Sequence, residues 1–334
     1  MRSRRHLGIA VGLLMTCAIA SSAEAQAIIS NGTVALGVNE LGNLNVPDGT
    51  GGVTLSPTNS SSIGLYSFAI DGDATSPGCL CEGFGISANG IAGYADIASG
   101  GVVNLSSVSF ASTADTATAV AELTSLAGFQ VSQFYHPSAS PDLFVVDVTL
   151  TNDTGADVTD VRYNRTMDWD IPPTTFSENV TIQGWPATAL LDSGDNGFQT
   201  PNPLEASIGL TNTNFTDFGP ADHGARFTFG FGDLAAGETK TFQIFYGVSG
   251  SEAAALAALG LVGAEVYSFG QCNTGAVEGC DAGLGTPATF IFGFAGVGGT
   301  PVQPPGEVPE PGSMVLLGSG LLGLVRYTRR RRND

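Results

Sequence analysis

Residues 143–150 read LFVVDVTL, a run whose second half alternates apolar and polar side chains. Such a period of two is typical of a β-strand with one buried face. The next residues, Asn152-Asp153-Thr154-Gly155, have the composition of a tight turn, and Val158 to Asp168 has the pattern of a second strand. The two runs together predict an antiparallel hairpin.

The same alternation recurs further along the chain. Residues 226–231 and 239–248 predict a second hairpin, and residues 289–294 predict a last strand. One helix is expected over Ser251 to Leu259, because Ser249 and Glu252 have the spacing of a capping box and Gly260 can end the helix. It is short and rich in Ala, so we expect it to cover an edge or end of a sheet. We therefore predict an all-β fold, a large antiparallel β-sandwich with one short helix.

Charge is distributed very unevenly along the chain. All but two of the 31 acidic residues lie within residues 26–310, beside only four basic residues, which gives this part a net charge of −25. Such a surface repels phosphate backbones, so nucleic-acid binding is excluded as a function class. It suits solubility outside the cell, and it can attract divalent cations or basic partners.

The N-terminus has the three parts of a secretory signal peptide. Arg2, Arg4 and Arg5 precede an apolar run from residue 7 to 20, and Ala23 and Ala25 form a small-x-small cleavage site. We expect the Sec machinery to export the chain and residues 1–25 to be removed. The mature body then spans residues 26–300.

The C-terminus also has three parts. Residues 301–311 (PVQPPGEVPEP) form a Pro/Gly linker, and residues 312–334 contain an apolar run followed by a basic cluster. The apolar run has about 14 residues where a comfortable membrane span needs about 20. The positive-inside rule places the cluster in the cytoplasm, so we expect a weak, temporary membrane stop. The arginines of this stop are Arg326, Arg329, Arg330, Arg331 and Arg332.

This tail resembles the PEP-CTERM sorting domain in the order VPEP (308–311), apolar run and arginine cluster. The resemblance implies recognition by exosortase, a membrane transpeptidase-like protease of Gram-negative bacteria that make exopolysaccharide. Pro309, Glu310 and Pro311 are then the sorting signal, and the chain passes through the inner membrane to the cell surface or the extracellular matrix. The alternative is an ordinary C-terminal membrane anchor.

The body is also similar, in the order of its segments, to the supersandwich of the galactose mutarotase-like group and to PEP-CTERM proteins that share these stretches. SNGTV (30–34), RYNRTMDWDIPP (162–173) and GETKTFQIFYG (237–247) carry this likeness. It is a likeness of fold, and activity has to be argued from a site.

Four cysteines remain after export: Cys79, Cys81, Cys272 and Cys280. The count is even and the exported compartment is oxidising, so two disulfides are expected, with three pairings open. Cys-x-Cys and Cys-x7-Cys do not match common zinc spacings, so no metal site is assigned to them.

Catalysis has weak support in the sequence. A mutarotase-like site needs a His and a Glu converging on a sugar, and no motif of a hydrolase, nucleotide-binding or metalloprotease class is present. The candidates for such a pair are His136, His223, Glu178, Glu205 and Glu265.

Met167-Asp168-Trp169-Asp170 is the most distinctive local cluster. An exposed Trp169 could stack on a sugar while Asp168 and Asp170 accept its hydroxyls, which makes these three the candidate ligand-binding residues. The interpretation that we favour is a core Trp, with Arg–Asp pairs that involve Arg162 or Arg165 and stabilise the end of a strand.

No cofactor is expected, with calcium as the alternative. Asp71-Gly72-Asp73 and Asp192-x-x-Asp195-Asn196 offer oxygen ligands, although neither completes an EF-hand loop. The leading hypothesis is an exported, non-enzymatic β-sandwich of the cell surface or the exopolysaccharide matrix. Its alternative is a carbohydrate-binding or carbohydrate-active domain of the mutarotase-like type.

Overall fold

A computed structural model describes residues 25–79, 81–96, 101–273, 280 and 288–304. Within these ranges the chain is mostly β-strand, with one α-helix and one short 3-10 helix, so the all-β prediction is confirmed. The signal peptide up to Glu24, the linker from residue 305 and the apolar tail lie outside the described residues.

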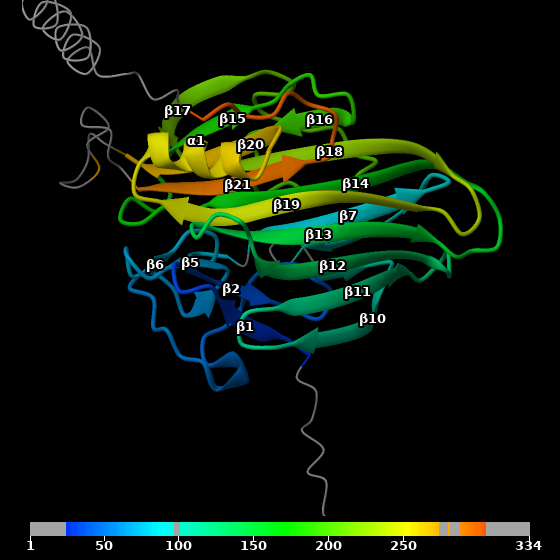
Figure 1. Cartoon of the computed structure of the whole chain (residues 1–334), viewed down its shortest axis with the longest axis horizontal. Helices are drawn as coiled ribbons and strands as arrows, with labels where there is room; N and C mark the ends of the chain where they lie inside the picture. Colours follow the sequence, from blue (N-terminus) through cyan, green and yellow to red (C-terminus); the bar gives the residue numbers. More distant parts are fainter. Residues whose placement is uncertain (1–24, 80, 97–100, 274–279, 281–287, 305–334) are drawn as a thin grey trace, which may run out of the picture.

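Two large antiparallel sheets form a sandwich (Figure 1). The nine-stranded sheet contains, in spatial order, β10 (Leu105–Ser112), β11 (Ala117–Leu123), β12 (Phe129–Pro137), β13 (Leu143–Asn152), β19 (Thr239–Ser249), β21 (Thr289–Ala295), β20 (Val266–Cys272), β15 (Glu178–Gln183) and β17 (Phe215–Ala221). The six-stranded sheet contains β16 (Leu190–Gly194), β18 (His223–Leu234), β14 (Val158–Trp169), β7 (Glu82–Ala88), β8 (Ile91–Asp96) and β9 (Gly101–Val103).

Two small sheets are formed by the N-terminal strands and lie beside the sandwich (Figure 1). One contains β1 (Ala27–Ser30), β2 (Val34–Val38), β5 (Leu65–Ser67) and β6 (Gly72–Asp73), and the other pairs β3 (Val46–Pro47) with β4 (Ser62–Ile63). The 3-10 helix η1 spans Thr50–Gly52. Val34, Leu36 and Leu65 join the main hydrophobic core, so the N-terminal segment is part of the same body.

Aromatic side chains from both large sheets fill the space between them. Phe227 of β18 contacts Phe292 of β21 with ring centroids 5.6 Å apart, and Tyr163 of β14 contacts Phe242 of β19 at 5.0 Å. Burying each such ring contributes about 1.5–3 kcal/mol, so these rings are a main source of the sandwich's stability.

The 143–150 run is buried on both faces for half of its length. Phe144 and Val146 enter the main core, whereas Leu143 and Val145 pack under the helix α1 (Glu252–Leu261). The helix lies on the outer face of the nine-stranded sheet (Figure 1). The expectation that it covers an edge or end of a sheet is therefore wrong. This second layer explains why the run begins as a continuous apolar stretch.

The helix begins two residues later than the expected capping box. Ser251 is the N-cap, and its side chain accepts a hydrogen bond from the Ala254 N–H. Ser249 ends β19, where its hydroxyl donates to Asp142. The helix runs past Gly260, and Gly263, with φ +67°, follows its last turn.

Both predicted hairpins are wrong, because each pair of strands is divided between the two large sheets. β13 pairs with β12 and β19, whereas β14 pairs with β18 and β7. The β13–β14 and β18–β19 connections cross from one sheet to the other and pack together. The Asn152 amide group donates to the carbonyls of Ala156, Leu234 and Ala235, which joins the two crossings.

Candidate functional site

The Met167–Asp170 cluster lies at the C-terminal end of β14. Met167 and Trp169 point into the core, which places Asp168 and Asp170 on the opposite side of the strand. Trp169 is 0% exposed, and its indole N–H donates to the Ser268 hydroxyl at 3.0 Å. A Cβ on Gly270 would lie 2.6 Å from the indole ring, so this glycine makes room for it. The core position favoured for Trp169 is therefore confirmed, and the other hypothesis, an exposed Trp169 that stacks on a sugar, is wrong.

The two arginines before the cluster pair with other acids. Arg165 is fully buried and binds Glu82, and Arg162 is partly exposed and binds Asp160 at 2.8 Å. The interpretation with a core Trp and an Arg–Asp pair is therefore confirmed for Trp169 and for Arg162, whose partner is Asp160, whereas Arg165 pairs with a glutamate. Asp168 and Asp170 are left without a cation from the described part of the chain.

Asp168 and Asp170 instead meet a third carboxylate. Asp222 lies between β17 and β18, and one oxygen from each of the three side chains lies within 4.8 Å of the other two. We call these three residues the acidic triad. Backbone bonds hold two of its members in place, because the Asp168 N–H donates to the Cys81 carbonyl at 2.9 Å and the Asp170 N–H to the Ala74 carbonyl at 2.8 Å.

Burial differs within the acidic triad. Asp168 is 1% and Asp170 is 0% exposed, whereas Asp222 is exposed to solvent. All four carboxylate oxygens of Asp168 and Asp170 are buried and accept no hydrogen bond from the described residues. Glu178, at the start of β15, is also fully buried: Oε1 accepts the His223 N–H at 2.7 Å, and Oε2 accepts none from the same part of the chain.

Other buried acids in the molecule are well supplied with donors. Asp73 accepts the N–H groups of Gly64, Thr75 and Ser76. Glu82 binds Arg165 and accepts the Leu44 N–H and the Tyr246 hydroxyl. Buried polar groups normally have such partners, so the unpaired carboxylates of the triad are exceptional within this fold.

The low-dielectric surroundings change the protonation of these acids. Burial, then repulsion from Asp170, Asp222 and Glu178, raises the pKa of Asp168 to about 10. Burial and the charge of Asp222 raise the pKa of Asp170 to about 8. Burial also raises the pKa of Glu178 to about 8, against the lowering effect of the His223 N–H. Without a bound cation, these groups hold protons at neutral pH.

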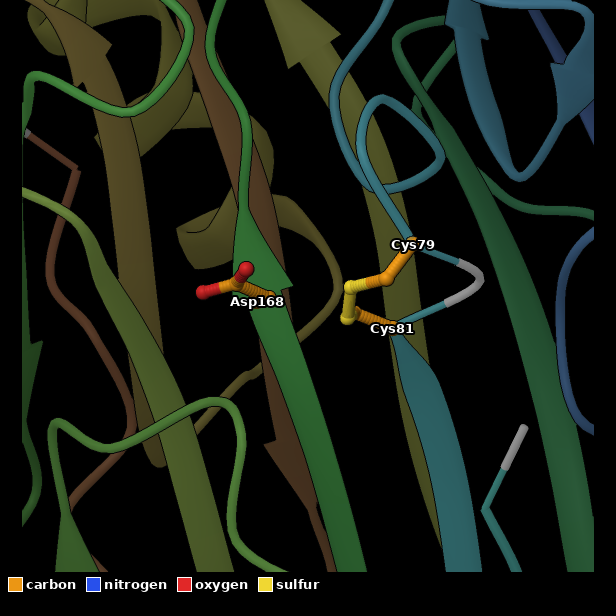
Figure 2. A group of neighbouring side chains, drawn as sticks. All are labelled: Cys79, Cys81 and Asp168. Carbon is orange, nitrogen blue, oxygen red and sulfur yellow. A yellow bond between two sulfur atoms is a disulfide. The ribbon is translucent and has the colours of Figure 1, made fainter. Parts of the chain in front are cut away.

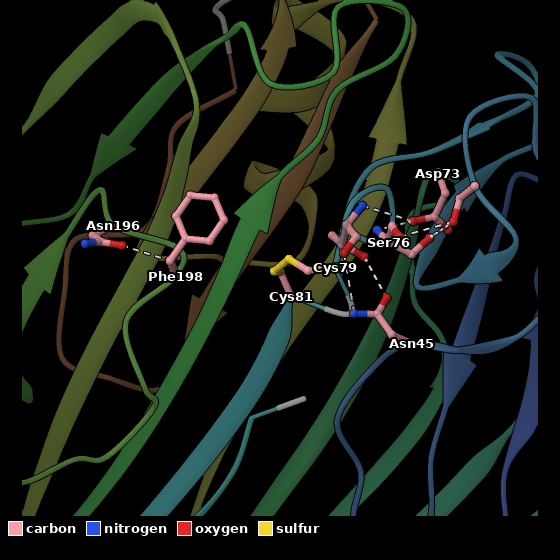
Figure 3. The surroundings of a disulfide bond; sticks show 9 residues. Asn45, Asp73, Ser76, Cys79, Cys81, Asn196 and Phe198 are labelled. Atoms are coloured by element: carbon pink, nitrogen blue, oxygen red, sulfur yellow. Dashed lines mark hydrogen bonds between the residues drawn. A yellow bond between two sulfur atoms is a disulfide. The ribbon is translucent and has the colours of Figure 1, made fainter. Parts of the chain in front are cut away.

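A disulfide lies beside the triad. The structure joins Cys79 to Cys81, and Figure 2 shows this bridge next to Asp168. The surroundings of the bridge in Figure 3 include Phe198 on one side and the hydrogen-bonded Asn45, Asp73 and Ser76 on the other. The other two cysteines, Cys272 and Cys280, form the second bridge, with Cα atoms 5.7 Å apart.

The two histidines of the body lie in different sheets. His136 is in β12, and its Nε2 lies 3.0 Å from Asp147 Oδ2. His223 begins β18, and its Nδ1 lies 3.2 Å from Asp195 Oδ2, while its Nε2 is buried without a partner among the described residues.

The three candidate carboxylates also separate. Glu178 adjoins His223, whereas Glu205 binds Thr200 and Asn202 in an exposed loop. Glu265 Oε2 accepts the N–H groups of Val297 and Gly299, and this side chain lines a cleft of about 280 Å³ together with Trp185.

The two calcium candidates of the sequence are used by the protein's own donors. Asp71 accepts the Tyr66 hydroxyl, and Asp73 accepts the three N–H groups named above. Asp192 binds Arg226, and Asp195 accepts the Leu210 N–H and pairs with His223. Both segments therefore use their carboxylates in hydrogen bonds and ion pairs within the protein, where they adjoin β6 and β16.

Asp222 was not singled out by the sequence. Acidic residues are abundant in the body, and nothing in the local sequence distinguishes Asp222 from the others. It reaches Asp168 because β18 pairs with β14 in a register that sets His223 opposite Trp169. Only this pairing, which the predicted hairpins missed, brings the three acids together.

The C-terminal segment carries the second functional feature, VPEP followed by an apolar run and five arginines. Residues 307–332 match the PEP-CTERM protein-sorting motif. The PEP-CTERM motif implies an exported protein that is processed by exosortase and sorted to the surface. Pro309, Glu310 and Pro311 fall inside the match and outside the described residues.

The comparison with curated proteins returned no match to this chain. In the described ranges, no helix is both long and apolar enough to cross a membrane. The PEP-CTERM motif therefore identifies the export route, and the role of the body has to be inferred from its own residues.

Proposed function

We propose that the chain is a protein of the cell surface or the exopolysaccharide matrix, whose sandwich body works without catalysis. The PEP-CTERM motif supports the destination. The position of Trp169 supports a body without catalysis, because this side chain fills the core and offers no face to a sugar substrate. His136 lies in the other sheet and pairs with Asp147, so it does not join His223 and Glu178 in one site.

The charge of the body is consistent with this role. A net charge of −25 over residues 26–310 keeps the protein soluble and repels nucleic acids and anionic lipids. It also favours cation-mediated association with acidic polysaccharide. We propose exopolysaccharide as the partner on these grounds, together with exosortase and the Sec machinery along the export route.

Cell fractionation tests the destination. A tagged chain expressed in a host with exosortase should become accessible to added protease on intact cells, or should appear in the extracellular matrix. A chain that lacks residues 307–334 serves as the control, and we expect it to leave this fraction. Retention of the full chain in the periplasm would contradict the proposal, and so would turnover of any glycoside by the purified protein.

A second candidate function is carbohydrate binding, favoured by the cleft between Trp185 and Glu265. The cleft is also lined by Gly298, Gly299 and Thr300, so it combines an indole ring with polar groups of the kind that hold a sugar. Indole faces stack on apolar sugar surfaces, and a carboxylate accepts hydroxyl protons.

A glycan-array screen of the full chain tests this candidate. Binding that is lost in Trp185→Ala but kept in Phe68→Ala, which removes an exposed ring from the connection between β5 and β6, would support the cleft as the site. An array without any bound glycan would remove carbohydrate binding from consideration and leave the first proposal in place.

A further inference from the structure

We propose that the acidic triad, Asp168, Asp170 and Asp222, binds a divalent cation of the calcium class. The triad lies where the end of β14 meets the connection between β17 and β18. It is distinct from both calcium candidates of the sequence, Asp71–Asp73 and Asp192–Asn196, and from the Trp185 cleft.

The first argument is geometric. Oxygen ligands lie about 2.3–2.6 Å from a calcium ion, so two oxygens on one ion are at most about 5 Å apart. The three carboxylates of the triad meet this limit, since their ligand atoms lie within 4.8 Å of one another. The pairwise distances are therefore compatible with one shared ion, and small adjustments of the side chains can bring all three oxygens within coordination distance.

The second argument is the missing donors. Asp168 and Asp170 are at least 99% buried, and none of their four oxygens accepts a hydrogen bond from the described residues. An unpaired buried carboxylate is costly, and proteins normally supply it with N–H donors or a metal. Asp73 and Glu82 show that this chain supplies N–H donors where it buries an acid for structure alone.

The third argument is the chemistry of the ligand set. Three carboxyl groups, with the unpaired Oε2 of Glu178 as a further acid nearby, form an all-oxygen ligand set among the described residues, and binding of a cation would release the protons that the buried acids hold. Hard cations prefer such ligands, and zinc prefers nitrogen and sulfur. The sulfur atoms beside Asp168 are joined in the Cys79–Cys81 bridge and are not available as thiolates.

Exposure of Asp222 completes the site. The ion can enter from solvent past this side chain, and water can fill the coordination positions that three side chains leave open. Once bound, the ion joins β14 of the six-stranded sheet to the connection that follows β17 of the nine-stranded sheet. Binding should therefore stabilise the contact between the two sheets at this end of the sandwich.

Calcium titration of the full chain tests the proposal. After treatment with EDTA and dialysis, isothermal titration with CaCl2 should show one saturable site, with a Kd on the order of 10⁻⁴ M as in other extracellular calcium modules. Thermal unfolding in excess CaCl2 should shift upward by several degrees. MgCl2 and ZnCl2 are titrated in parallel.

Substitutions test whether the ion binds at the acidic triad. Asp168→Asn/Asp170→Asn keeps the side-chain shape, removes both buried charges and should abolish the titration heat and the thermal shift. Asp153→Asn is the matched control, because this exposed acid lies in the turn between β13 and β14, and its response to CaCl2 should equal that of the unaltered chain. If the double variant does not fold, the exposed Asp222→Asn should still fold and weaken binding at least about tenfold.

Three results would overturn the proposal. The first is the absence of a saturable calcium response in the unaltered chain at millimolar CaCl2. The second is a full response in folded Asp168→Asn/Asp170→Asn, which would place the ion among the other acids of the body. The third is a site that takes zinc in preference to calcium, which would indicate that the buried Nε2 of His223 is a ligand.

Discussion

At the scale of single residues, Arg165 and Arg162 show how burial changes the energetics of an ion pair. Both are in β14, three positions apart. Arg165 and Glu82 are fully buried, and the guanidinium group also donates to Gln133, the Gly42 carbonyl and the hydroxyls of Tyr135 and Tyr163. Arg162 and Asp160 are 29% and 49% exposed. Loss of one partner therefore leaves an unpaired buried charge in the first case and a solvated one in the second.

We predict that Arg165→Met lowers the free energy of unfolding by about 3–5 kcal/mol, because Glu82 is left unpaired in the core. Arg162→Met should change it by no more than about 1 kcal/mol. Urea unfolding measures both. The double variant Glu82→Met/Arg165→Met removes both charges and should recover part of the loss. Equal effects of the two single variants would show that the buried network is not important for stability.

The buried acids near the triad predict an unusual pH dependence of stability. Asp170 and Glu178 have folded pKa values of about 8, above their ordinary values of 3.8 and 4.5. The native state therefore holds protons that the unfolded state releases. In the metal-free protein, the contribution of these groups to stability should be fully present below pH 4. Between about pH 4 and 8, the free energy of unfolding should fall by up to about 1.4 kcal/mol per pH unit for each proton that the native state keeps and the unfolded state releases.

Urea unfolding in EDTA at pH 5, 6 and 7 measures this dependence. Asp168→Asn/Asp170→Asn cannot titrate at two of the sites, so its stability should fall less steeply over the same range. Asp73, Asp168 and Asp222 are the acids near Asp170, and His223 lies beside Asp222, whose pKa its charge lowers. Burial and the neighbouring acids still leave the pKa of Asp170 raised to about 8. Stability that rises from pH 5 to 7 in the unaltered, metal-free chain would contradict the raised pKa values.

At the scale of elements, α1 offers a direct test of its N-terminal cap. Ser251→Ala removes the hydroxyl that accepts the Ala254 N–H and should cost about 1 kcal/mol. Ser251→Asn keeps a capping oxygen and should stay close to the unaltered protein in thermal unfolding. If Ser251→Ala and Ser251→Asn are equally stable, the hydroxyl is not the effective cap.

The strands themselves were predictable, and their partners were not. Alternation over residues 143–150 and 226–231 reports that one face is buried, without indicating which strand lies beside it. A turn such as Asn152–Gly155 fits a hairpin and a crossing between sheets equally well. What selects the crossing is the bonding of Asn152 to Leu234 and Ala235, more than 80 positions along the chain, a contact that no local pattern reveals.

The candidate site was predictable to a similar extent. The spacing of Asp168, Trp169 and Asp170 places the ring and the two acids on opposite sides of a strand. Both sides are buried here, so the sequence could not decide which one faces solvent. Asp222 joined the group only through the register of β14 and β18, which follows from the long-range topology.

At the scale of the whole molecule, the charge distribution separates the parts of the chain. The acidic body carries four of the 12 basic residues, and the remaining eight lie at the two ends. The C-terminal tail was predictable because it depends on composition and order, and the PEP-CTERM match agrees with that interpretation. The N-terminal signal peptide stays a prediction.

The last prediction is that the mature surface protein lacks Met314 to Asp334. An apolar run of about 14 residues makes a helix about 21 Å long, shorter than the roughly 30 Å of the hydrocarbon core. From the positive-inside rule we expect the arginines to hold its end at the cytoplasmic face and the Pro309-Glu310-Pro311 signal to lie near the outer face of that membrane. Residues 301–311 contain five prolines, which lack N–H donors for a protective hydrogen-bonded structure, so a protease can reach this segment.

Intact-mass measurement of the surface fraction checks this prediction, and we expect a mass without residues 314–334. Replacement of Pro309, Glu310 and Pro311 by alanine should leave an unprocessed chain in the inner membrane. The matched control replaces Pro301, Pro304 and Pro305, which lie in the same linker outside the matched residues, and its processing should be unchanged. A surface protein that still carries its arginines would mean that the apolar run is an ordinary anchor. A removable sorting signal is cut from the mature protein, whereas a permanent span stays attached, so the same segment cannot be both.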